Sequence, residues 1–233
     1  MKKEQFIEIE NYMLKCMTDS AHDKEHIYRV LYTALDIAQH ESNVDFDVLI
    51  ASCLLHDIGR QEQFDNPKLC HAAVGAEKAY QFLIKNAYDE EFSSQVKDCI
   101  KSHRYRVDEP PRSIEAKILF DADKIDVTGA LGIARTIFYQ GQVGEPLYSL
   151  LPDGQISDGT NDTTPSFFRE YKYKLESLYD KFYTERAACI AKARKNSAVS
   201  FYKSIVEEAS SSYTGKNLLT DYINELNRVI TSS

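Results

Sequence analysis

Apolar residues recur at helical spacing along most of the chain. A repeat every three or four positions predicts a helix over residues 3–17. The same spacing predicts further helices at about residues 20–40, 45–58, 69–87, 90–103, 113–139, 166–210 and 215–230. No stretch shows a convincing strand period of two, and glycine and proline are scarce. The pattern therefore predicts an all-α fold, a helical bundle in one domain.

Segment 45–58 differs from the other predicted helices because it is apolar on almost every side. A helix of that kind belongs at the centre of a bundle. Gly59 follows it directly and is expected to end it as the residue after the C-cap.

A long interruption separates the predicted helices that end at about 139 from those that begin at 166. Residues 141–165 hold four Gly and three Pro and lack Lys and Arg. The length of this segment exceeds the usual limit of about 12–15 residues for a loop in a compact domain. Loops of such length are typically lids or other functional loops. We expect residues 1–233 to form one domain, with a motif core at about 20–136, a loop or lid at 141–165 and C-terminal helices at 166–233.

Composition narrows the partners and the location. The formal net charge is −8, so an overall basic footprint for a nucleic acid polymer or an anionic membrane is absent. No apolar run reaches the ~18–20 residues of a membrane span, and the start of the chain does not have the pattern of a signal peptide. The five cysteines are widely spaced and are expected to be reduced thiols. These features predict a cytoplasmic protein with no membrane partner.

The pair His56–Asp57 follows an apolar run and is the first candidate for chemistry. A buried carboxylate is costly unless it is paired, hydrogen-bonded or bound to a metal. Either a divalent metal or a His–Asp hydrogen bond would meet this need. Adjacent helix positions differ by about 100°, so both side chains reach one ion only near a helix end. Cys53, one turn earlier, is expected to be a small core residue rather than a nucleophile.

Two further elements place polar side chains on helix faces. His26 and Arg29 share one face of a predicted helix, and so do Asp123 and Asp126. A solvated histidine and surface acids are the simpler interpretations of each element taken alone. Asp121 is offset from Asp123 by about 200° and is expected to point away from it.

The order of these elements resembles that of the HD superfamily of metal-dependent phosphohydrolases. The resemblance is carried by the segments HDKEHIYRV, LLHDIGR, HAAVGAEKA, SHRY and DADKIDVTGALGIART, within residues 20–136. More narrowly, the chain is similar to small bacterial HD-domain nucleoside triphosphate pyrophosphohydrolases.

The resemblance implies a set of site residues. The four that match the metal ligands of the family are His26, His56, Asp57 and Asp123. They would hold one divalent ion, with Mn, Co, Ni, Fe and Zn all compatible with such ligands. His71 and His103 lie where binuclear relatives supply two more ligands, so they would bind a second metal or contact substrate phosphate or water. Asp126 is the candidate catalytic residue that orients or deprotonates water, and the candidate phosphate-binding residues are Arg29, Lys124 and Arg104.

The function expected from this resemblance is metal-dependent hydrolysis of a small phosphorylated nucleotide. Its specific form would cleave a nucleoside triphosphate to monophosphate and pyrophosphate. The alternatives are a nucleotide phosphomonoesterase, a binuclear-iron HD oxygenase and a non-catalytic nucleotide-binding module. Tyr105, Tyr139 and Tyr148 are candidates for stacking on a base.

Overall fold

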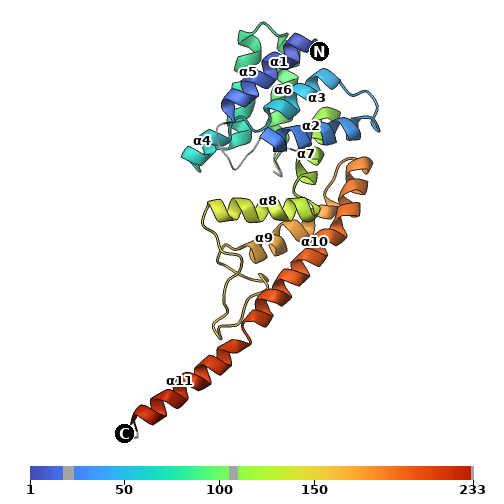
Figure 1. Ribbon diagram of the computed structural model, residues 1–233. Coiled ribbons are helices and arrows are strands. Elements are labelled where there is room, and N and C mark those ends of the chain that lie inside the picture. Colours follow the sequence, from blue (N-terminus) through green and yellow to red (C-terminus); the bar gives the residue numbers. More distant parts are fainter. Residues whose placement is uncertain (18–23, 105–109, 232–233) are drawn as a thin grey trace.

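The computed structural model describes residues 1–17, 24–104 and 110–231, and most of these are helical (Figure 1). The helices are α1 (Lys3–Cys16), α2 (Lys24–Ala38), α3 (Phe46–Leu55), α4 (Arg60–Asp65), α5 (His71–Lys85), α6 (Glu90–Ser102), α7 (Ile114–Ile125), α8 (Gly129–Gln142), α9 (Phe167–Tyr173), η1 (Leu175–Asp180), α10 (Glu185–Ser212) and α11 (Gly215–Thr231). The described ranges contain no strand, and an isolated antiparallel bridge joins Leu150 and Ile156. The all-α prediction is confirmed.

Helix α3 lies at the centre of an N-terminal bundle formed by α1 to α7, as its apolar pattern predicted. The Asp45 side chain caps its first turn by accepting from the backbone N–H groups of Asp47 and Val48. Most of its residues are buried, and it packs against α1, α2, α6 and α7. The end of α3 at Leu55 therefore brings His56 and Asp57 into the middle of the bundle.

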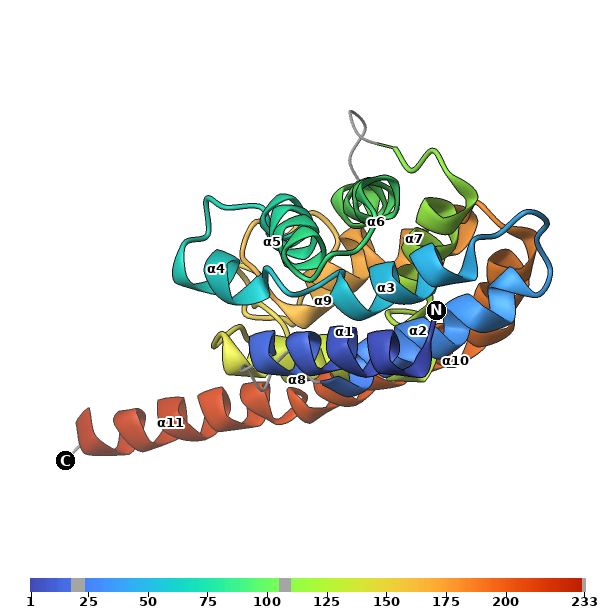
Figure 2. The same ribbon diagram turned by 90° about the horizontal axis from the view of Figure 1, so that it is seen from above.

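A second apolar cluster joins α8, α9, η1 and α10 beneath this bundle (Figure 1). Its largest fully buried side chains are Phe167, Phe168 and Tyr171. The partly buried Phe182 packs against both clusters and links them. Figures 1 and 2 show α11 extending from the end of α10 away from both cores. Among the described residues, no helix combines the length and the apolar character that crossing a lipid bilayer requires.

The single helix predicted over 113–139 is in fact two helices, α7 and α8. Gly129, at the start of α8, has a φ of +68°, which L side chains rarely adopt. A Cβ atom on Gly132 would lie 2.1 Å from the carbonyl carbon of Val127, so the missing side chain allows the backbone to fold tightly there. The break places Asp123 in the last turn of α7 and Asp126 at its C-cap.

The helix predicted over 166–210 is also divided, into α9, η1 and α10. Asp121 explains where α10 begins. Its buried carboxylate accepts from the backbone N–H groups of Tyr183 and Thr184 and from the Thr184 hydroxyl, at 2.7 to 3.1 Å. The prediction that Asp121 points away from Asp123 is confirmed, and its role is to hold the C-terminal half against α7.

Gly59 does not end α3 in the way that the sequence predicted. Its φ is −96°, so it is not a left-handed residue after a C-cap, and it precedes the short helix α4, which the sequence analysis missed. A Cβ atom at this position would lie 2.4 Å from the carbonyl oxygen of His71 and 2.6 Å from the nitrogen of Gly75. Gly59 is there because the start of α5 approaches its backbone so closely.

The loop predicted over 141–165 lies at 143–166 and is packed onto the C-terminal helices. The backbone N–H groups of Phe167 and Phe168 donate to the carbonyl oxygens of Pro146 and Leu147 at 3.0 Å. Further along the loop, the hydroxyls of Ser149 and Ser157 donate hydrogen bonds to the Asp162 carboxylate. The hydroxyl of Tyr202, on α10, donates to the Asp158 carbonyl. These contacts favour an ordered connecting loop over a lid.

Candidate metal centre

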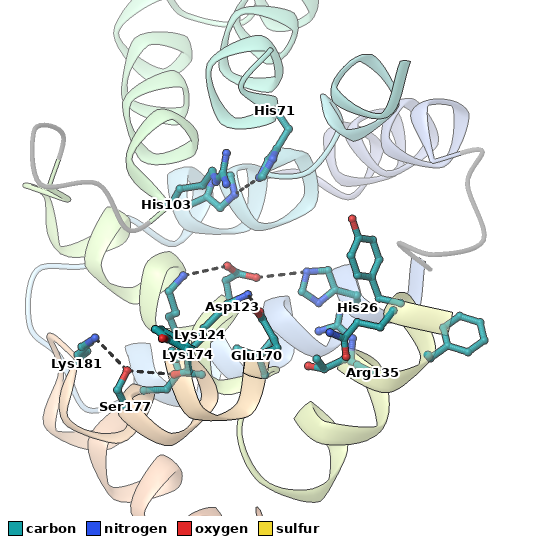
Figure 3. Close-up of a pocket in the computed structure, with 18 of the residues that line it drawn as sticks. His26, His71, His103, Asp123, Lys124, Arg135, Glu170, Lys174, Ser177 and Lys181 are labelled. Carbon is teal, nitrogen blue, oxygen red and sulfur yellow. Dashed lines mark hydrogen bonds and ion pairs between the residues drawn. The ribbon is translucent and has the colours of Figure 1, made fainter. Parts of the chain in front are cut away.

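A cavity of about 690 Å³ lies between the N-terminal bundle and the C-terminal elements α8, α9 and η1. Figure 3 shows His71 and His103 on one side of it, Asp123 and His26 in the middle, and residues of α9 and η1 on the opposite wall. The cavity is thus built by segments that are more than a hundred residues apart in the chain.

Two groups of side chains in the described residues could hold a metal ion. The first is His26, His56 and Asp123, and the second is Asp57, His71 and His103. Within each group, one ligand atom from each residue lies within 4.8 Å of the others. The structure therefore brings together the four residues predicted as ligands of one metal and the two histidines predicted to lie beside it.

Asp57 connects the two groups. Its Oδ2 atom lies 3.6 Å from Nε2 of His26 and 3.7 Å from Nε2 of His56. Its Oδ1 atom lies 3.5 Å from Nε2 of His71 and 3.6 Å from Nε2 of His103. The carboxylate is fully buried, yet neither oxygen accepts a hydrogen bond within the described residues. Four imidazoles surround these two oxygens at a spacing that suits ions placed between them.

The hydrogen bonds of the histidine Nδ1 atoms explain why the Nε2 atoms point inward. Three of these bonds are His56 to the Cys53 carbonyl at 2.8 Å, His103 to the Ile100 carbonyl at 2.6 Å and His71 to Gln63 Oε1 at 2.5 Å. An Nδ1–H that donates to an oxygen leaves the Nε2 lone pair free for a metal.

Burial raises the pKa of the Cys53 thiol, which agrees with the predicted role of Cys53 as a core residue.

His26 is oriented by Asp126, the carboxylate for which the sequence predicted a catalytic role. His26 Nδ1 lies 2.7 Å from Asp126 Oδ2. Arg29 donates to both Asp126 oxygens, at 2.8 and 3.1 Å, and Arg135 also donates to Oδ2. The Asp126 carboxylate is thus occupied behind His26, which favours a positioning role over water activation. Arg29 is engaged there too and does not line the cavity.

The pKa values of the two first-group histidines move in opposite directions. Burial lowers the pKa of His56 to about 4. Burial also opposes protonation of His26, but hydrogen bonds to Asp123, Asp126 and Asp57 outweigh it and raise the pKa of His26 to about 10. The acids around His26 thus stabilise a positive charge in the centre, which is the environment a metal cation requires.

The side chains that line the cavity are mostly cationic among the charged ones, although the formal net charge of the chain is −8. Three acidic side chains line it, compared with six cationic ones. The cationic residues are Arg60, Arg104, Lys124, Arg135, Lys174 and Lys181. Lys124 and Arg104 were predicted to contact phosphate, and both lie on this surface. The sequence analysis did not name the last three as candidates: Arg135 lies in the segment DADKIDVTGALGIART without having been singled out, and Lys174 and Lys181, which flank η1, lie outside the quoted segments. The seven-residue spacing of Lys174 and Lys181 was the one sequence feature that placed these two side chains on the same side of the chain.

The three candidate tyrosines have different positions. Tyr139 lines the cavity. Tyr148 does not, because its ring packs against Phe168 and Tyr213 instead. Tyr105 lies outside the described residues.

Comparisons with known proteins identify a family and several relatives that this chain resembles. Residues 24–128 match the HD domain family. The chain is 28% identical to YpgQ of Bacillus subtilis over 207 residues, which is 86% of this chain and 92% of that protein. The crystal structure of YpgQ in complex with ADP is similar, with a TM-score of 0.67 and 25% identity over 88% of this chain and 97% of that one.

Two further solved structures are described as HD-superfamily hydrolases. One from Bacillus thuringiensis has a TM-score of 0.66 and 25% identity, and covers 89% of this chain and 98% of its own. One from an uncultured Thermotogales bacterium, a predicted hydrolase, has a TM-score of 0.57 and 29% identity, and covers 88% of this chain and 92% of its own. The chain therefore has the fold of HD-superfamily hydrolases.

Proposed function

We propose, on the premise that residues 24–128 are an HD domain, that the protein is a metal-dependent phosphohydrolase acting on a small phosphorylated nucleotide. The observation that carries this proposal is the buried Asp57 carboxylate, whose oxygens face four inward-pointing imidazoles and accept no hydrogen bond in the described residues. A buried carboxylate is costly without a cationic partner, and the ion pair with Arg60 is made by Oδ1 and leaves Oδ2 facing His26 and His56.

The first group of ligands, completed by Asp57 Oδ2, fits a divalent transition metal. His26, His56, Asp57 and Asp123 offer two imidazole nitrogens and two carboxylates. Mn, Fe, Co, Ni and Zn all accept this mixed set. When bound, such an ion supplies Lewis-acid polarisation of a phosphoryl oxygen and activation of water. Asp57 Oδ1, His71 and His103 would hold a second ion, or the two histidines would meet substrate phosphate.

The cationic surface of the cavity supports a polyanionic substrate. Lys124 and Arg104 are proposed to bind phosphate oxygens, and Arg135 adds a third charge on the α8 side. Pockets for small molecules are usually about 300–1,000 Å³, so a cavity of about 690 Å³ has room for a nucleotide. Tyr139 offers an aromatic face for a base. The ADP complex of YpgQ supports a nucleotide ligand, and cleavage of a nucleoside triphosphate to monophosphate and pyrophosphate is the proposed reaction.

A panel of nucleoside mono-, di- and triphosphates, screened with Mn²⁺, Co²⁺, Ni²⁺, Fe²⁺ and Zn²⁺, tests the proposal. We expect pyrophosphate release from a triphosphate with at least one of these ions, and loss of turnover after treatment with EDTA. Orthophosphate release from monophosphates would instead identify a phosphomonoesterase. Oxygen consumption with two bound irons would identify an oxygenase, and nucleotide binding without turnover would identify a non-catalytic module.

Asp126→Asn tests the orientation of His26. The amide keeps the shape of the side chain but weakens its bonds to His26, Arg29 and Arg135. Loss of such an outer contact typically lowers metal affinity by about 10–100-fold, and we expect a loss in this range by Mn²⁺ titration, with helical content unchanged. Asp36→Asn is the matched control, since Asp36 pairs with Arg186 away from the centre. An unchanged Mn²⁺ affinity in Asp126→Asn would remove the positioning role.

A further inference from the structure

Arg60 directs a positive charge at the second group of ligands. Its Nε atom lies 2.9 Å from Asp57 Oδ1, the oxygen that faces His71 and His103. This Nε atom is buried and makes no hydrogen bond within the described residues. The ion pair with Asp57 therefore offsets the cost of burying it, and Oδ1 already has a cationic neighbour.

A metal ion at the second group would lie close to this guanidinium. Metal–oxygen bonds in such sites are about 2.0–2.2 Å, so an ion on Oδ1 would lie within about 5 Å of Arg60 Nε. Two cations this close in a buried site repel each other strongly. Arg104 lines the same part of the cavity.

The first group has a different charge balance. There, Asp57 Oδ2 and Asp123 Oδ1 both face His26 Nε2, at 3.6 and 3.4 Å. The nearby cation, Lys124, lies 3.7 Å from the other oxygen of Asp123. A metal ion at the first group would thus lie beside two carboxylates. A metal ion at the second group would share one carboxylate oxygen, Asp57 Oδ1, with Arg60.

From this contrast we infer that Arg60 competes with a second metal ion for Asp57 Oδ1 and so limits the protein to one bound ion per chain. The inference rests on the proposed function and decides between its two roles for His71 and His103. With Arg60 in place, these histidines, Arg60 and Arg104 face substrate phosphate beside a single ion.

Metal stoichiometry tests this inference directly. The full-length protein is stripped of metal and titrated with Mn²⁺, and bound ions are counted by elemental analysis and by the spin coupling of paired Mn²⁺ in electron paramagnetic resonance. We expect one ion in the unaltered protein and two in Arg60→Gln, with the Kd of the second ion lowered at least ~10-fold by loss of the repulsive charge. Arg60→Lys keeps the charge and should bind one ion. Arg186→Gln, which removes an arginine paired with Asp36, should also bind one.

Further variants locate the gained ion and guard against misfolding. Adding His71→Ala to Arg60→Gln should return the count to one. If Arg60→Gln loses helical content, Arg60→Met retains the aliphatic stem and carries the same expectation. In the unaltered protein, titration to high Mn²⁺ should show any second ion binding at least ~10-fold more weakly than the first.

The outcomes separate this inference from the proposed function. Two ions of equal affinity in the unaltered protein would overturn the inference, and so would a single ion in folded Arg60→Gln. Neither result affects the proposed hydrolysis. An unaltered protein that binds no divalent ion would instead refute the proposed function itself.

Discussion

Asp57→Asn is expected to abolish metal binding and hydrolysis while leaving the helical fold in place. The carboxylate lies between four imidazole Nε2 atoms at 3.5 to 3.7 Å, so it is the side chain that both ligand groups share. The amide has nearly the same volume but no negative charge. We expect the Kd for Mn²⁺ to rise at least ~100-fold and turnover to fall at least ~1,000-fold, since water activation depends on the bound ion.

Calorimetric Mn²⁺ titration and a pyrophosphate-release assay measure the two effects, and circular dichroism checks the fold. Asp98→Asn is the matched control, because Asp98 is an exposed aspartate on α6. It should behave as the unaltered protein does. Turnover in Asp57→Asn close to that of the control would refute the assignment of the metal centre.

Gly59→Ala is expected to destabilise the protein strongly even though it adds a single methyl group. That methyl carbon would lie 2.4 Å from the His71 carbonyl oxygen and 2.6 Å from the Gly75 nitrogen. Both are backbone atoms at the start of α5, so a side-chain rotation cannot relieve the clash. Overpacking of a core usually costs about 1–3 kcal/mol, and we expect a loss of at least ~3 kcal/mol in the free energy of unfolding because a helix must shift.

Urea unfolding monitored by circular dichroism measures this loss. Gly141→Ala provides the contrast, since a Cβ atom there has no neighbour within 4 Å and the residue is in α8. It should be neutral or stabilising by about 0.5–1 kcal/mol, the helix propensity gain of alanine over glycine. Equal stability of the two variants would show that α5 tolerates displacement from Gly59.

The sequence pattern predicted the elements whose signal is local. The burial of α3 followed from its apolar composition, and the divergence of Asp121 from Asp123 followed from helical geometry. The break between α7 and α8 was missed because it depends on the left-handed backbone of Gly129 and on the contact of Gly132 with Val127. Neither feature interrupts the apolar repeat. The same limit applies to Gly59, because its close neighbours His71 and Gly75 are 12 and 16 residues further along the chain.

The candidate site was predicted unevenly for a similar physical reason. His26, His56, Asp57 and Asp123 stand in recognisable segments, and the structure places them together. The role of Asp126 depends on the direction of its carboxylate, which spacing on a helix face does not define. Arg135 and Lys174 reach the cavity only because the C-terminal helices fold back beneath the bundle.

The end of α7 contacts both halves of the molecule. The Asp121 carboxylate accepts hydrogen bonds from the backbone N–H groups of Tyr183 and Thr184, just before α10. Two residues later, the Asp123 carboxylate faces His26. Because one helical turn carries both carboxylates, displacement of the C-terminal helices would pull on the same turn that presents a metal ligand. The position of Asp123 in the metal centre therefore depends on how the C-terminal helices are anchored to α7.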